Sequence, residues 1–428
     1  MTSLKRSSNL MLLYACATLL ACGGGESDAA GGAAPAPGPA PTPALGPAPA
    51  PAPGPAPSTG TACDTASGRV LEVGTGKAYS VPSAAAAVAR DGDVIKISAG
   101  EYRGDVAAWS ANRLTICGVG GRARLYAAGR NYGGKAIWVV NGSDITIDSV
   151  EFHDASVPDQ NGAGIRAEHG GTLTIRNSGF YDNENGVLGA YGSASVVIEG
   201  SEFARNGYGD GYSHNIYIGE AALLSVSNSF FHEARIGHNL KSRAQQTRIE
   251  NSYFMDGPSG TSSYLADFPN GGRVYLRGNL FHKGPNADNS VAISYGAEGL
   301  KWSTNTLEMV HNTVVITRSG GTFISAPSGT QSVKLTANLF AGTNGPSLIS
   351  GGFVSANVVS AGNITSTASN FSGADNIASP NFWPNATLQA LIGLGSVLDA
   401  TYAKDSPKPL STRAVSSPSK AGALQAAP

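Results

Sequence analysis

Two short segments, 24 residues apart, hold the side chains best suited to chemistry in this chain. Ser213–Gly219 reads SHNIYIG and Gly237–Arg243 reads GHNLKSR, so the two align without a gap. If they lie in successive layers, equivalent residues stack: His214 on His238, Asn215 on Asn239, Ile216 on Leu240, and Tyr217 on Lys241. Imidazole, amine and phenol groups can exchange protons, and a guanidinium can hold a carboxylate through two hydrogen bonds. The sequence therefore predicts a surface that binds an anion and moves protons.

The next layer adds an acid to this surface. In Tyr264–Asn270, a step of 26 residues brings Asp267 beside Lys241 and turns Ala266 inward, whereas a register error of one residue would reverse that choice. Four residues are candidates for catalysis: Tyr217, His238, Lys241 and Arg243. Five more are candidates for substrate binding: His214, Asn215, Asn239, Asp267 and Asn270. Weaker candidates are Asp210, Tyr212 and Glu298.

Most of these groups also have a structural interpretation. Lys241 and Asp267 can form a surface ion pair of little consequence. The two histidines and the two asparagines can form hydrogen-bonded ladders, and Arg243 can stack on a neighbouring layer. Tyr217 can serve as a sugar platform or as a proton donor. Lys241 can act as a base only where burial and Arg243 favour its neutral form.

A sequence repeat predicts the elements that position these residues. An apolar-x-apolar unit recurs and is followed five residues later by one of these residues: Phe152, Phe180, Phe203, Phe231, Phe254, Phe281, Val314 and Phe340. A polar residue suited to a tight turn lies two positions earlier in most units: Ser178, Ser201, Ser229, Ser252, Asn279, Asn312 and Asn338. Steps of 23 to 33 residues are too short for propeller blades of ~40–45 residues. We therefore predict an all-β fold, a single-stranded right-handed parallel β-helix with one coil per repeat.

The ends of the repeat predict caps and domain limits. Ser83–Arg90 is an Ala-rich helix candidate that would cover the first coil. Thr387–Leu394 is a second capping-helix candidate. We expect the β-helix domain to span residues 62–400 and residues 401–428 to form a disordered tail.

The N-terminus reads as an export signal. Lys5 and Arg6 precede the apolar stretch Leu10–Ala21, which ends at Cys22 and resembles a bacterial lipoprotein box. This predicts a signal peptide over residues 1–21, lipidation of Cys22, and a Gly/Ala/Pro-rich disordered linker up to residue 61. The expected location is the cell envelope, as an outer-membrane lipoprotein or a secreted protein, with membrane contact only through the lipid anchor. An ordinary signal peptide with an incidental cysteine is the alternative.

Cysteine use and charge narrow the partners. Cys63 and Cys117 can form a disulfide in an oxidising envelope, or they can be two buried thiols. Charged residues make up only 14% of the chain and the formal net charge is −1, so a nucleic-acid partner has no electrostatic support. We expect a monomer.

Two stretches resemble known families. Ala84–Tyr102 resembles the opening of pectate-lyase-like β-helix proteins. Ile216–Gly219 followed by Leu240–Ser242 resembles the core of the chondroitinase B and alginate lyase family, whose members cleave uronic-acid polysaccharides by β-elimination. The resemblance implies that Lys241 is the catalytic base. It also makes calcium a conceivable cofactor, but Gly237 and His238 stand where the family has acidic ligands.

The expected function is thus a lyase that acts on an acidic polysaccharide. The family's Arg proton donor is absent, because Asp267 and Phe268 occupy its place. A metal-independent variant would use Arg243 to neutralise the substrate carboxylate, Lys241 or His238 as the base, and Tyr217 or a histidine as the acid. The alternatives are a non-catalytic polysaccharide-binding or adhesin protein, a glycoside hydrolase and a C5-epimerase on the same fold.

Overall fold

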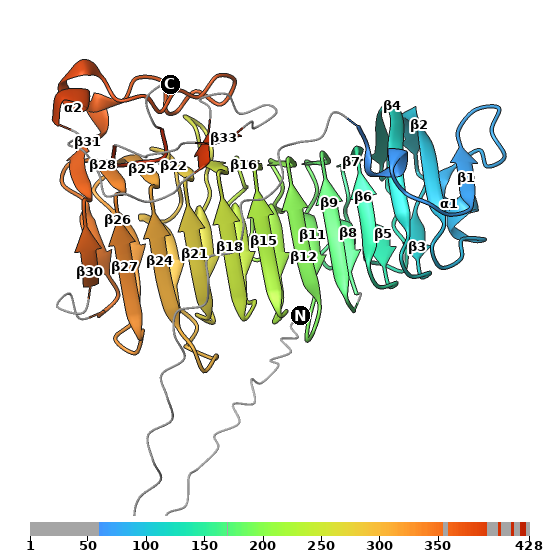
Figure 1. Cartoon of the computed structure of the whole chain (residues 1–428), viewed down its shortest axis with the longest axis horizontal. Coiled ribbons are helices and arrows are strands. Elements are labelled where there is room, and N and C mark those ends of the chain that lie inside the picture. Colours follow the sequence, from blue (N-terminus) through green and yellow to red (C-terminus); the bar gives the residue numbers. More distant parts are fainter. Residues whose placement is uncertain are drawn as a thin grey trace, which may run out of the picture. The chain divides into compact units, whose positions relative to one another are not determined.

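The computed structural model describes residues 60–168, 170–353, 358–391, 401–403, 412–414 and 420–424. Within this part, the chain winds into coils that stack strand on strand (Figure 1). A typical coil has three strands, and strands of successive coils pair in parallel. The all-β parallel β-helix expected from the repeat is confirmed.

The strands define three faces of the stack. Face I contains β1 (Val70–Val73), β6 (Ile145–Asp148), β9 (Thr172–Arg176), β12 (Ser195–Glu199), β15 (Leu223–Ser227), β18 (Gln246–Glu250), β21 (Arg273–Arg277), β24 (Thr306–Val310), β27 (Ser332–Thr336) and β30 (Val358–Ala361). Face II contains β7 (Val150–His153), β10 (Gly179–Tyr181), β13 (Glu202–Ala204), β16 (Phe230–His232), β19 (Tyr253–Met255), β22 (Leu280–Lys283), β25 (Thr313–Ser319), β28 (Leu339–Thr343) and β31 (Ile364–Thr367). Face III contains β3 (Ala107–Trp109), β5 (Ala136–Val140), β8 (Ala163–Ala167), β11 (Asn185–Gly189), β14 (Ile216–Ile218), β17 (Leu240–Ser242), β20 (Ala266–Phe268), β23 (Val291–Tyr295), β26 (Thr322–Ser325) and β29 (Ser347–Ser350).

The remaining elements lie at the ends of the stack or run through two faces. Strands β2 (Val94–Arg103) and β4 (Thr115–Tyr126) each contribute to both face I and face II. The helical elements are η1 (Ala62–Asp64), α1 (Pro82–Ala86), η3 (Ala368–Asn370) and α2 (Ala386–Leu391). Strands β32 (Thr401–Ala403) and β33 (Thr412–Ala414) pair antiparallel.

The repeated aromatic residue forms the spine of the core. Phe152, Phe180, Phe203, Phe231, Phe254 and Phe281 are fully buried and stack in register, with ring centroids 4.5 to 5.0 Å apart. Val314 and Phe340 continue the row. Burial of apolar surface drives this packing. Because each coil contributes one residue to the row, neighbouring coils are held in register.

The polar residue before each aromatic forms the predicted turn ladder between faces I and II. The backbone N–H of Ser178 donates to the hydroxyl of Ser201 at 3.2 Å, and that of Asn279 donates to the side-chain oxygen of Asn312 at 3.0 Å. The residue just before the ladder has a positive φ, for example 47° at Asn177, where Asn tolerates the left-handed region. Each coil therefore turns at the same place.

A helix covers the N-terminal end of the stack, as expected, but it is shorter than predicted. Helix α1 has five residues, shorter than the predicted Ser83–Arg90, and it contacts β3, the edge strand of face III. Its Ala85 is buried in the core. Cys63 and Cys117 form a disulfide that joins η1 to β4.

The last described part of the chain covers the outside of face II from β16 to β28. Phe371, Phe382 and Leu388 pack on outward residues of β16 to β28, together with residues 421, 423 and 424. The backbone N–H of Gly422 donates to the carbonyl of Ala337 at 2.7 Å. The expectation of a disordered tail therefore does not hold for residues 420–424. The segment predicted to form the signal peptide, lipidated Cys22 and most of the linker lies outside the described residues, and no described helix is long and apolar enough to cross a membrane.

Candidate active site

The predicted surface lies on the outside of face III. Tyr217 on β14, Lys241 on β17, Asp267 on β20 and Ser294 on β23 are register partners in successive coils. Their apolar neighbours Ile216, Leu240 and Ala266 are fully buried. The gap-free alignment and the step of 26 residues therefore gave the right register and the right orientation of the side chains.

Lys241 lies between two carboxylates. Its Nζ is 3.0 Å from Oε1 of Glu298 and 3.8 Å from Oδ2 of Asp267. It also lies 5.6 Å from the centre of the Tyr217 ring. Only 12% of the Lys241 side chain is exposed. The ammonium is thus held near the surface by opposite charges on both sides.

Arg243 connects most of the other polar side chains of the site. Its Nε donates to the Tyr217 hydroxyl at 2.8 Å, and its two Nη atoms reach Asn270 Oδ1 and Glu298 Oε2, each at 2.5 Å. Burial lowers the pKa of Arg243, but the hydrogen bonds to Glu298 and Tyr217 raise it by more. Arg243 is therefore a fixed cation at the centre of the site.

Two acids from turns lie at this surface: Glu298 contacts the central cations, and Glu220 lies at the rim without contacting them. Glu298 follows β23, and 47% of its side chain is exposed. Partial burial raises the pKa of Glu298, but the hydrogen bonds from Arg243 and Lys241 lower it by more. Glu220 accepts hydrogen bonds from Asn270, at 3.1 Å, and from Lys301. Glu298 was only a weak candidate in the sequence, yet it contacts both central cations.

His214 and His238 stack as predicted but lie beneath the surface. Their rings are 4.5 Å apart and nearly parallel, and each residue is buried. Nδ1 of His214 accepts a hydrogen bond from the backbone of His238 at 3.0 Å, and Nε2 of His238 lies 3.4 Å from Asp267. Burial, with nearby cations, holds the pKa of both histidines well below the usual value. His238 accordingly supports Asp267 from below and offers no free basic nitrogen to a substrate.

Asp267 is the most perturbed acid of this surface. Its side chain is 3% exposed, and burial raises its pKa to about 6, although Lys241 and Ser294 oppose the rise. A buried carboxylate with a raised pKa beside a lysine marks this surface as a candidate functional site.

Asn215 and Asn239 do not reach the surface. Both are fully buried and belong to a second internal ladder, which also contains Asn183 and Asn206. The Asn215 amide donates to Asn239 at 2.7 Å. A substrate-binding role for these two residues finds no support in this geometry, whereas Asn270 lies at the charged surface through its bond from Arg243.

A buried lysine next to the site escaped the sequence reasoning. Lys283 on β22 is fully buried, and its Nζ donates to the carbonyls of Ser262 and Ser263 at 2.8 and 2.6 Å. Burial lowers its pKa to about 8. It fixes the loop that leads into β20 and therefore helps to position Asp267. The only signal in the sequence was a charge two residues after Phe281, the aromatic residue of the repeat.

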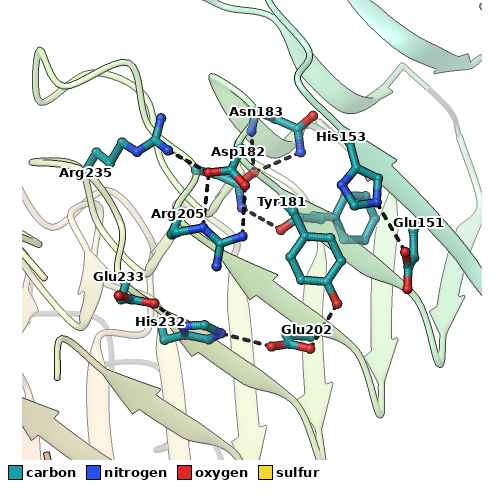
Figure 2. A network of polar contacts seen from close by, with 12 residues as sticks. Glu151, His153, Tyr181, Asp182, Asn183, Glu202, Arg205, His232, Glu233 and Arg235 are labelled. Atoms are coloured by element: carbon teal, nitrogen blue, oxygen red, sulfur yellow. Dashed lines mark hydrogen bonds and ion pairs between the residues drawn. The ribbon is translucent and has the colours of Figure 1, made fainter. Parts of the chain in front are cut away.

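A second polar cluster, which the sequence also did not predict, lies on the outside of face II (Figure 2). The Tyr181 hydroxyl donates to Glu202 at 2.9 Å, and His232 bridges Glu202 and Glu233 at 3.0 and 2.9 Å. His153 lies 3.2 Å from Glu151. The bonds of Tyr181 and His232 to Glu202 run between neighbouring coils, and the ring of His153 stacks on that of Tyr181, so the cluster crosses β7, β10, β13 and β16.

The calcium implied by the resemblance finds no matching ligands. Among the described residues, no group of three or more His, Cys, Asp or Glu side chains is placed to hold a metal ion. The acids of face III are occupied by Lys241, Arg243 and Lys301.

Comparison with known proteins supports the fold. A family model described as a right handed beta helix region matches residues 129–307. The pectate lyase Pel9A superposes with a TM-score of 0.57 at 14% identity, covering 85% of this chain and 98% of that one. An alginate lyase from Paenibacillus sp. str. FPU-7 gives 0.49 at 17% identity, covering 68% and 99%. No curated protein matches the sequence. The chain therefore has a right-handed parallel β-helix fold of the pectate-lyase-like kind, and at these identities the likeness concerns the fold alone.

Proposed function

We propose that this protein is a polysaccharide lyase that cleaves a uronic-acid-containing polymer by β-elimination on face III. One observation carries the proposal: Lys241 and Arg243 together hold a carboxylate, that of Glu298, at 3.0 and 2.5 Å on an outward face. A uronate presents the same group. Structural likeness to polysaccharide lyases is consistent with this substrate class.

Three side chains divide the reaction among them. Arg243 pairs with the substrate carboxylate, which stabilises the enolate-like intermediate and so makes the C5 hydrogen more acidic. Lys241 is an ammonium in the free protein, so it first releases a proton to solvent, and the resulting amine then takes the C5 proton. The bond between C4 and the glycosidic oxygen then breaks, a C4–C5 double bond forms, and the leaving oxygen takes a proton from Tyr217. The Tyr217 oxygen accepts from Arg243 at 2.8 Å, so its own hydrogen is free to point at the substrate.

His238 has no part in this proton transfer. Its Nδ1 lies 3.4 Å from the backbone N–H of Tyr264, which donates to it, and its Nε2 faces Asp267. Lys241 is the one remaining base among the four catalytic candidates, because Arg243 stays charged and Tyr217 serves as the acid. We also propose that the domain works at the cell envelope, tethered through Cys22, on the basis of the N-terminal sequence.

The test is turnover by the purified protein. It is incubated with polygalacturonate, alginate, chondroitin and a neutral glucan, each with and without chelator. Unsaturated uronate ends absorb in the ultraviolet, so their rate of appearance reports β-elimination. We expect absorbance to rise with at least one acidic polymer and not with the glucan; no rise with any acidic polymer contradicts the proposal.

A non-catalytic polysaccharide-binding protein is the second candidate. It is favoured by one observation, the two carboxylates that flank Lys241 and make it a paired ammonium. The variant Lys241→Ala separates the two functions. Loss of product with binding retained supports the lyase, and polymer binding by a wild-type protein that forms no product supports the binder.

A further inference from the structure

Glu298 occupies the position that a substrate carboxylate needs. One oxygen faces Lys241 Nζ at 3.0 Å and the other faces Arg243 Nη2 at 2.5 Å. This two-point contact matches the way a guanidinium and an ammonium recognise a uronate. We infer that Glu298 is an internal competitor: it fills the carboxylate subsite in the free protein, and a uronate residue of the substrate displaces it. The inference rests on the proposed function.

Displacement requires only a movement of the side chain. The backbone around Glu298 is fixed, because its N–H donates to the carbonyl of Pro269 and that of Lys301 donates to Asn270, both at 3.0 Å. The Glu298 side chain is itself half exposed, and it is held by its hydrogen bonds from Lys241 and Arg243. It can therefore turn toward solvent while the turn that carries it stays in place.

The competitor also defines the ligand class. A neutral sugar cannot replace the charge of Glu298, so Lys241 and Arg243 would keep their internal partner. A uronate supplies an equivalent carboxylate and loses no ion pairing in the exchange. The site thus selects carboxylated polymers, and its affinity is lowered by the competition, as expected when a binding-competent state is only fractionally populated.

Glu220 provides a matched control. It is also a partly exposed acid on the rim, with 38% of its side chain exposed. However, it pairs with Lys301 and Asn270 and not with Lys241 or Arg243. Glu220→Gln and Glu298→Gln change the net charge equally. Only Glu298→Gln removes the carboxylate that lies between Lys241 and Arg243.

The experiment measures binding of a uronate hexamer by calorimetry at neutral pH. Both substitutions are made in a Tyr217→Phe background, which lacks the proton donor and preserves the ligand. The hexamer is drawn from whichever acidic polymer the wild-type protein cleaves, or from polygalacturonate and polymannuronate if it cleaves none. We expect Glu298→Gln to lower Kd by about two- to fivefold, the range for loss of a part-exposed ion pair. Glu220→Gln should leave Kd nearly unchanged.

Three results overturn the inference or its basis. Unchanged or weaker binding by Glu298→Gln shows that Glu298 does not compete. Equal tightening by both variants shows a general effect of net charge. If the Tyr217→Phe protein binds no uronate hexamer, the result contradicts the proposed function itself, on which the inference about Glu298 rests. Circular dichroism of each variant confirms that the fold is retained.

Discussion

The polar clusters of face III and face II are built in the same way but hold their charges differently. Each consists of outward side chains on consecutive coils, one centred on Lys241 and Arg243, the other on Glu202 and His232 (Figure 2). On face II, a hydrogen bond from His153 lowers the pKa of Glu151. On face III, burial raises the pKa of Asp267 to about 6.

Asp267 is the acid that distinguishes the two clusters, because the pKa of Glu298 on face III is lowered, as is that of Glu151 on face II. A carboxylate whose pKa falls on folding stabilises the native state at neutral pH, and one whose pKa rises destabilises it. Face II therefore has the electrostatics of a structural element. Face III retains an unfavourable buried charge, as expected of a surface that is shaped by chemistry rather than by stability.

The largest expected difference between the clusters is in turnover. Lys241→Met removes the proposed base and should slow the formation of unsaturated ends by about a hundredfold or more. Tyr181→Phe removes the hydroxyl that is bonded to Glu202 on face II and should leave the rate unchanged. Rates from the absorbance assay and melting curves are compared for both variants. An equal loss of rate in Lys241→Met and Tyr181→Phe would contradict the assignment of catalysis to face III.

The next largest effect is on stability, and it has an unusual sign. Because folding raises the pKa of Asp267 from 3.8 to about 6, its contribution to stability is fully present below pH 3.8 and is lost as the pH rises through 6. Asp267→Asn mimics the protonated form, so at pH 8 it should stabilise the protein by about 2 to 3 kcal/mol. Its free energy of unfolding is measured in denaturant from pH 4 to 8.

The gain from Asp267→Asn should shrink as the pH falls through 6 and vanish near pH 4. The variant should also turn over more slowly, since Asp267 positions Lys241 and His238. A variant that is less stable than wild type at pH 8 would show that the ion pair with Lys241 outweighs the cost of burial.

On face II, replacing an acid should change the free energy of unfolding in the opposite direction and by a smaller amount. The hydrogen bond from His232 is the main cause that lowers the pKa of Glu233, so its contribution to stability is present above about pH 4.5 and is lost as the pH falls through its folded pKa. Glu233→Gln should therefore destabilise the protein at pH 7 by about 1 kcal/mol or less, because the side chain is partly exposed. The same denaturant series serves as the measurement, and a stabilising effect at pH 7 would contradict the contrast.

The fold and the strand part of the site could be predicted because both recur once in each coil. Phe180, Phe203 and Phe231 indicated the coils. The gap-free alignment of the two segments and the step of 26 residues gave the register that brings Tyr217, Lys241 and Asp267 together. Strand alternation then gave the outward direction of Lys241.

Contacts made by turns and loops could not be predicted in this way. Glu298 comes from a turn whose reach depends on its own backbone path, and no strand register specifies it. His238 and Asn239 precede β17, where alternation does not yet apply, so their burial was not visible in the sequence. The ladder of Asn215 and Asn239 was one interpretation of the sequence, but its continuation to Asn206 was hidden, because that bond spans only nine residues.

A crystal structure of the Tyr217→Phe protein with a bound uronate oligomer tests the central claim most directly. The account predicts a sugar carboxylate in contact with Lys241 Nζ and Arg243 on face III, with the Glu298 side chain turned toward solvent. An oligomer bound on face II, or on face III with Glu298 still bridging Lys241 and Arg243, would contradict it.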